Sequence, residues 1–217
     1  TGMDLARRLK SQLADAHIHG LAGRTDGADV TFDHVADHLR SLFQSGEAIV
    51  GICAAGILIR SLASVLSDKT GEPPVIAVSA DGGSIVPLLG GHHGGNRLAL
   101  DIATLTGGNA ALTTAGDVRY GLALDEPPAG WRVGNAAAAK GISARLLAGE
   151  TVALVHDCGD IGWLCDSGAP FDTHAAPGDT GAVRVTEKAL VDVGDQLILH
   201  PPVLALGLGC ERNCAPE

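Results

Sequence analysis

Aromatic side chains are scarce in this sequence, since phenylalanine, tryptophan and tyrosine together make up 3% of its 217 residues. A site that stacks bases or encloses a cation in an aromatic cage would have few rings to use. Positive charge is also scarce, because 15 lysines and arginines stand against 25 acidic residues and give a formal net charge of -10. We therefore expect no nucleic-acid partner and no anionic membrane surface. An anionic small molecule stays open, because a local pocket can oppose the net charge.

Other absences concern the membrane, the redox setting and metals. No apolar run reaches the roughly 18 residues of a membrane-spanning helix, and no basic-then-apolar signal segment opens the chain. The five cysteines include no CxxC pair, and the polar run from His156 to His174 matches no structural zinc spacing. We therefore predict a cytoplasmic protein without a metal or a cofactor.

Alternating strand-like and helical patterns predict an α/β fold. Continuous apolar runs at residues 48–52 and 75–78 are typical of strands buried on both faces, and helical spacing follows the first of them. The predicted fold is a mostly parallel sheet with flanking helices, followed by a smaller α/β domain. Helices are expected at residues 4–13, 33–43, 57–66, 97–105 and 136–147. Strands are expected at residues 48–52, 75–78, 111–114, 151–155, 183–185, 196–199 and 203–206. Pro87 makes residues 84–89 an edge strand or an irregular segment.

The order of these elements predicts three segments. Residues 1–124 form the first α/β domain, whose helix starts so close to Thr1 that an opening strand is expected before it. Residues 125–130 are the best linker candidate, because they combine acidic residues with proline and glycine. The second domain covers residues 125–200, and residues 201–217 begin a truncated third domain.

The run from Gly90 to Asn96, with the sequence GGHHGGN, is the first candidate site. Its glycines permit close backbone approach, and Asn96 is expected to cap the following helix. Amides at a helix N-terminus can hold an oxyanion or a carboxylate, and His92 or His93 can act as a general base near neutral pH. The alternative is a tight turn with solvated histidines.

Two other loops follow predicted strands. The small-residue turn at residues 53–56 leads into the helix that carries Arg60, and open α/β sheets bind ligands at such carboxyl ends. Cys53 itself is expected to be a small core residue rather than a nucleophile. Thr113, Thr114 and Asp117 follow another strand, where their oxygens can either orient a substrate or cap a turn.

Several pieces of residues 46–117, taken in order, resemble the N-terminal domain of the CbiG family of cobalamin biosynthesis. They are GILIRSLA at 56–63, SDK at 67–69, PVIAV at 74–78, VPLLGGH at 86–92, GGNRLA at 94–99 and TTAGD at 113–117. Residues 130–200 are similar to the family's middle region, and residues 203–214 look like the start of its C-terminal domain. The glycine-histidine loop differs from the family pattern, because it is one small residue shorter and has Gly90-Gly91 where Ser-Gly is usual.

The resemblance implies an enzyme of the cobalt-precorrin-5A hydrolase type, which opens a δ-lactone on a corrin precursor and releases acetaldehyde. His92 or His93 would activate the water, and amides around Gly94, Gly95 and Asn96 would hold the oxyanion. The other substrate-binding candidates are Gly56, Arg60, Lys69, Arg97, Thr113, Thr114 and Asp117.

The implied partner is a corrin-precursor tetrapyrrole, with or without cobalt. One alternative is an auxiliary module fused to, or in contact with, a precorrin-3B C17-methyltransferase. A second alternative is an α/β scaffold that binds a tetrapyrrole without chemistry. Self-association as a homodimer is also left open.

Overall fold

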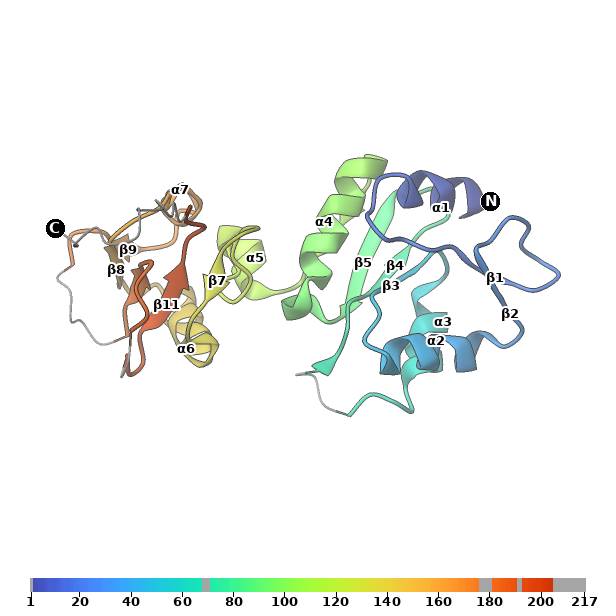
Figure 1. The fold of residues 1–217 in the computed structure, drawn as a ribbon, viewed down its shortest axis with the longest axis horizontal. Helices are drawn as coiled ribbons and strands as arrows, with labels where there is room; N and C mark the ends of the chain where they lie inside the picture. Colours follow the sequence, from blue (N-terminus) through green and yellow to red (C-terminus); the bar gives the residue numbers. More distant parts are fainter. Residues whose placement is uncertain (1, 68–70, 176–180, 191–192, 205–217) are drawn as a thin grey trace, which may run out of the picture. The chain divides into compact units, whose positions relative to one another are not determined.

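The computed structural model describes residues 2–67, 71–175, 181–190 and 193–204 (Figure 1). The chain divides into two compact units, unit 1 (Thr1–Val118) and unit 2 (Arg119–Glu217). This division falls earlier than the predicted limit at residue 124, because Leu122 and Leu124 are buried in the core of unit 2. The predicted third segment lies largely outside the described residues. Within the described residues, no helix is long and apolar enough to cross a membrane.

A four-stranded sheet forms the centre of unit 1, in the order β3-β4-β5-β6. Its strands are β3 (Ile49–Gly51), β4 (Val75–Val78), β5 (Ser84–Leu89) and β6 (Asn109–Ala110). Strands β3 and β4 are parallel, β5 is antiparallel to β4, and β6 is parallel to β5. The predicted α/β class is confirmed, but this sheet is mixed, because the tight turn at residues 79–83 sends β5 directly back along β4.

Helices cover both faces of this sheet (Figure 1). On one face, α1 (Gly2–Lys10) and α4 (Gly95–Thr106) share a buried cluster with Ile76, Val78 and Ile85. On the other face, α2 (Val35–Gln44) and α3 (Ala55–Leu62) share a cluster with Val75 and Ala77. All four residues of β4 are therefore buried, which explains the unbroken apolar run in the sequence.

Two short strands of unit 1 lie outside the main sheet. Strands β1 (His19–Leu21) and β2 (Val30–Phe32) pair with each other in parallel. Strand β1 positions His19, and the helix α2 that follows β2 carries His38. No apolar alternation marks these strands in the sequence, so periodicity did not predict them.

The described part of unit 2 contains a five-stranded sheet in the order β7-β11-β10-β8-β9. They are β7 (Arg132–Val133), β8 (Val152–His156), β9 (Phe171–Asp172), β10 (Val183–Val185) and β11 (Leu197–His200). All pairs are parallel except β7 with β11. Helix α6 (Ala136–Leu147) packs on β8 and β11, and the short α7 (Gly162–Cys165) places Trp163 edge-on to Trp131. Unit 2 therefore has the predicted α/β class, and its sheet is largely parallel.

Some local predictions are wrong. Helix α4 has Gly94 as its N-cap, so Asn96 lies inside the first turn instead of capping it. Residues 111–114 form no strand, because the ladder between β5 and β6 ends at Ala110. The abundance of glycine, aspartate and proline in residues 157–179 predicts loops, but helix α7 and strand β9 lie within this range.

Candidate functional site

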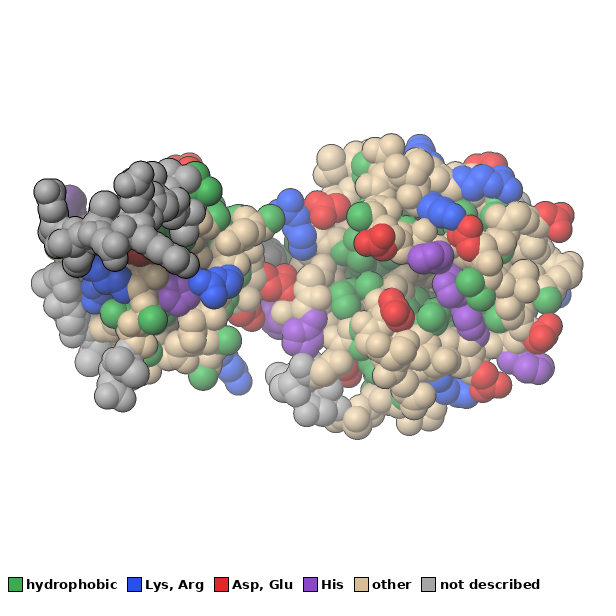
Figure 2. Space-filling model, viewed as in Figure 1, with side chains coloured by type: hydrophobic (Ala, Val, Ile, Leu, Met, Phe, Trp, Pro, Cys, Tyr) green, Lys and Arg blue, Asp and Glu red, His purple; other side chains and the backbone are tan. Residues whose placement is uncertain are grey.

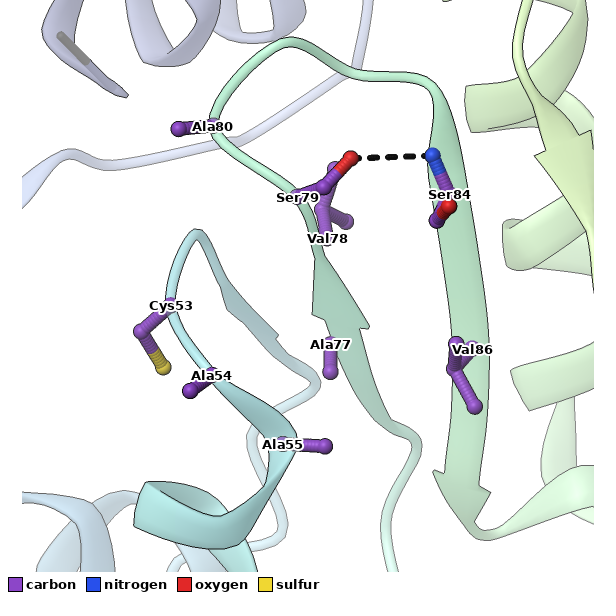
Figure 3. A pocket seen from close by; sticks show the side chains of 9 residues that line it. All are labelled: Cys53, Ala54, Ala55, Ala77, Val78, Ser79, Ala80, Ser84 and Val86. Atoms are coloured by element: carbon purple, nitrogen blue, oxygen red, sulfur yellow. Dashed lines mark hydrogen bonds between the residues drawn. The ribbon is translucent and has the colours of Figure 1, made fainter.

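A pocket of about 410 Å³ opens at the carboxyl ends of β3 and β4 (Figure 3). Small apolar side chains form most of its lining, including Ala55 at the start of α3, Ala77 on β4 and Val86 on β5. None of the described residues that line it carries a formal charge. The pocket can therefore accept a small apolar group, but its lining offers no general base among these residues.

A hydrogen-bonded turn closes one side of this pocket. The Ser79 hydroxyl donates to Asp81, and Oγ of Ser79 accepts from the Ser84 amide at 2.9 Å (Figure 3). Asp81 also accepts a hydrogen bond from the Gly83 amide at 3.0 Å. The hydrogen bond from Ser79 and, to a lesser extent, the one from Gly83 lower the pKa of the Asp81 carboxyl group. The Ser79 hydroxyl is thus already engaged in the turn between β4 and β5.

The Cys53 thiol lies at the mouth of the same pocket. Burial raises the pKa of this thiol, which keeps it protonated at neutral pH. This environment agrees with the expectation that Cys53 is a packing residue rather than a nucleophile.

The glycine-histidine loop lies at the opposite edge of the sheet. Because β5 is antiparallel to β4, Leu89 pairs with Val75 at the amino end of β4. Gly90 then packs against the backbone of Pro73, where a Cβ atom would lie 2.6 Å from the Pro73 carbonyl oxygen. The loop is therefore separated from the pocket by the length of β4.

Internal hydrogen bonds give this loop one defined shape. The Gly90 carbonyl accepts from the amides of His93 and Gly95, each at 2.9 Å. Gly90 and Gly94 adopt left-handed backbone conformations with φ of 64° and 89°, and residues Gly91–His93 form a single 3₁₀ turn. The Gly95 amide therefore donates its hydrogen bond within the loop and stabilises this loop conformation.

The two loop histidines are both exposed, and His93 has a fixed partner. Its Nδ1 lies 2.8 Å from the carbonyl oxygen of Glu72. A carbonyl can only accept, so Nδ1 carries the hydrogen and the neutral ring presents the Nε2 lone pair to solvent. This is the tautomer and orientation that a general base needs.

Asn96 connects the loop to the segment that follows β6. Its side chain is 6% exposed, and its Nδ2 donates to Oγ1 of Thr114 at 2.8 Å. A Cβ atom on Gly91 would lie 3.2 Å from Oδ1 of Asn96, so the amide sits between the loop and Thr114. The predicted candidates on both segments are therefore brought together, although they are 18 residues apart in sequence.

Removing either partner of this bond is expected to destabilise unit 1. We expect Asn96→Ala and Thr114→Val each to cost about 1–2 kcal/mol of unfolding free energy, because a buried polar group loses its partner. The double variant should cost less than the sum of the two, with a coupling of about 1 kcal/mol. Urea unfolding followed by circular dichroism measures all three. Strict additivity would show that the bond contributes nothing.

The remaining candidates are scattered. Gly56 and Arg60 lie on α3 near the pocket, where a Cβ on Gly56 would come within 3.0 Å of the Arg60 guanidinium. Arg97 is on α4 beside the loop and pairs with Asp101 at 3.1 Å on the exposed surface. Thr113 is exposed next to Thr114, Asp117 lies in α5 (Ala115–Tyr120), and Lys69 lies outside the described residues.

The polar run of unit 2 forms pairs rather than a metal cluster. Asp157 accepts from Arg184 at 3.0 Å, and this partner holds the pKa of the Asp157 carboxyl below its usual range. The Cys158 thiol donates to Glu187 at 2.7 Å, which raises the pKa of the thiol. No group of three or more His, Cys, Asp or Glu side chains among the described residues is placed to hold a metal ion.

Family profiles of known proteins match both units of the chain. The family profile described as "Cobalamin synthesis G N-terminal" matches residues 37–117. The profile described as "Cobalamin biosynthesis central region" matches residues 127–201. Each matched range lies within one structural unit, and the two ranges occur in the order of their names.

Two curated proteins named cobalt-precorrin-5A hydrolase are similar to this chain. The Priestia megaterium protein is 28% identical over 98% of the chain and 63% of its own length. The Salmonella typhimurium protein is 35% identical over 57% of the chain and 36% of its own length. The chain thus spans less than two thirds of either relative. A solved structure described as a cobalamin biosynthesis protein G homolog from Sulfolobus solfataricus is 17% identical, with a TM-score of 0.38 and coverage of 79% of this chain and 51% of its own.

Proposed function

Because this chain belongs to the CbiG family of cobalamin biosynthesis, we propose that it supplies the N-terminal and central regions of a cobalt-precorrin-5A hydrolase. The observation that carries this proposal is the ordered match of two profiles of that family, one in each structural unit. Both curated relatives bear the name of that activity. The proposed substrate is a cobalt-bearing corrin precursor.

The chemistry of this reaction defines what the site must provide. Opening a δ-lactone requires an activated water molecule and donors for the oxyanion of the tetrahedral intermediate. A carboxylate-rich tetrapyrrole also requires cationic side chains around the cleft. The glycine-histidine loop offers a histidine to activate the water and backbone amides for the oxyanion. Arg97 on the adjacent helix α4 offers a guanidinium group beside the loop.

In this proposal His93 is the general base. The Glu72 carbonyl holds its Nδ1–H, so Nε2 accepts a proton from water at the exposed end of the ring. The loop backbone near Gly94 and Asn96 would supply oxyanion donors, and the Asn96–Thr114 hydrogen bond would hold that backbone in place. The pocket at the other edge of the sheet lacks a comparable base among its lining residues, which leaves it outside this chemistry.

Acetaldehyde release from cobalt-precorrin-5A tests the proposed function. Three proteins are compared: the 217-residue chain, the Priestia megaterium relative, and a chimera in which this chain replaces the matching region of that relative. We expect the chimera to release acetaldehyde and to open the lactone. A chimera that folds and binds the substrate without releasing acetaldehyde would contradict the hydrolase and favour the non-catalytic binding module.

A further inference from the structure

Two histidines from different elements of unit 1 contact each other through their ring nitrogens. Nδ1 of His19 on β1 lies 2.8 Å from Nε2 of His38 on α2. One nitrogen must donate and the other must accept, so one of the two rings already presents a lone pair at the contact. Phe32 stacks on the His38 ring at a centroid distance of 4.3 Å and an angle of 9°, which holds that ring in place.

The spacing of the two rings suits a shared metal ion. Their centroids are 4.9 Å apart. Two imidazoles bound to one ion at metal–nitrogen distances of about 2.0–2.1 Å have centroids about 4.6 Å apart at a right angle and about 5.3 Å apart at a tetrahedral angle. The observed separation falls between these values, so the distance between the rings suits one shared ion.

We propose that His19 and His38 form a two-imidazole site for a divalent late first-row transition ion such as Zn²⁺, with water completing its coordination. Imidazole nitrogen is a preferred ligand of these ions. Binding needs no net loss of a proton from a neutral pair, because the donor ring can move its hydrogen to its other nitrogen. His19 and His38 are both partly exposed, so an ion can reach their rings. Figure 2 shows histidine side chains at the surface of unit 1.

Among the described residues, no acidic side chain joins this pair in a group of three possible metal ligands. Asp29 lies nearby, but its Oδ1 contacts Nζ of Lys10 at 2.5 Å and its Oδ2 accepts from the Ile18 amide at 2.7 Å. Two protein ligands therefore imply modest affinity that depends strongly on each imidazole.

Calorimetric titration of the tag-free 217-residue chain with ZnCl₂ at pH 7.5 tests this site. We expect one equivalent to bind, and we expect His19→Ala and His38→Ala each to weaken binding by at least about tenfold. His34→Ala is the matched control, because His34 is exposed next to α2 and outside the pair, and it should bind as the unaltered chain does. Absence of binding at 0.1 mM ZnCl₂, a concentration on the order of a weak site's Kd, would overturn the proposal. It would also be overturned if both pair variants bound Zn²⁺ as tightly as the unaltered chain does.

A second measurement covers variants that fail to fold. In the unaltered chain, Zn²⁺ should shift the ring-nitrogen resonances of His19 and His38 in long-range ¹H–¹⁵N spectra and leave those of His34 in place. Shifts confined to other histidines would also overturn the site. Neither readout depends on the proposed hydrolase activity, so failure of one proposal leaves the other standing.

Discussion

Replacing His93 by alanine is expected to lower kcat for lactone opening by about 100- to 10,000-fold, the range that a positioned general base contributes. The expectation rests on the contact between Nδ1 of His93 and the Glu72 carbonyl, which selects the tautomer with a free Nε2 lone pair. KM should change much less, because the role assigned to the ring is proton transfer rather than substrate binding. Steady-state kinetics of the chimera described above, with lactone opening itself followed, give both kcat and KM.

His92→Ala is the matched control for this prediction. His92 is the neighbouring exposed histidine in the same 3₁₀ turn, so its removal changes the loop to a similar extent. We expect its effect on kcat to be smaller than that of His93→Ala by about tenfold or more. If His92→Ala proves the more damaging change, the tautomer argument fails. If neither change slows lactone opening, the loop is not the catalytic site.

Placing an alanine at Gly90 is expected to destabilise unit 1 by about 3 kcal/mol, a large fraction of a typical domain's stability. Two effects combine at this position. The backbone is left-handed, with φ of 64°, and a Cβ would lie 2.6 Å from backbone atoms of Pro73 and Pro74. Neither proline backbone can move without disturbing the entry to β4, so the clash has no easy relief.

Two neighbouring glycines separate these effects. At Gly94 the backbone is also left-handed, but no atom lies within 4 Å of an added Cβ, so Gly94→Ala should cost only about 1–2 kcal/mol. Gly95→Ala tests the contact by itself, because its Cβ would lie 2.7 Å from the Gly90 carbonyl oxygen and no left-handed φ is involved. We expect it to cost about 1–3 kcal/mol.

Hydrogen exchange of the α4 amides in urea measures the stability of unit 1 for all three variants. Both tryptophans, Trp131 and Trp163, lie in unit 2, so the fluorescence transition reports on unit 2 separately from the exchange of the α4 amides. Equal stability of Gly90→Ala and Gly94→Ala would show that the packing against Pro73 contributes nothing.

The prediction of the buried strand at residues 75–78 illustrates what local pattern can establish. Four consecutive apolar residues imply burial on both faces, and the structure places helices on both sides of β4. The same holds for the helix at residues 136–147, whose observed bounds are those predicted. The resemblance to the CbiG family also came from short pieces of sequence taken in order, and the two family profiles confirm it.

The position of the candidate residues required the tertiary structure. The sequence Asp81-Gly82-Gly83 is typical of a turn, but it does not indicate that β5 returns antiparallel to β4. The glycine-histidine loop consequently lies at the edge of the sheet opposite Gly56, instead of sharing the ligand-binding edge of a parallel sheet. The predicted cap at Asn96 is wrong because α4 begins after Gly94, and the Asn96 side chain instead makes a long-range bond to Thr114.

The sequence by itself thus determined the fold class, the buried strands and the family, because periodicity and ordered short segments are properties of neighbouring residues. Only the tertiary structure decided which polar groups meet. The bond between Asn96 and Thr114, the contact of His93 with Glu72 and the pairing of His19 with His38 each join residues 18 to 21 positions apart. Strand direction and helix packing set such contacts, and no local pattern encodes the direction in which a strand returns.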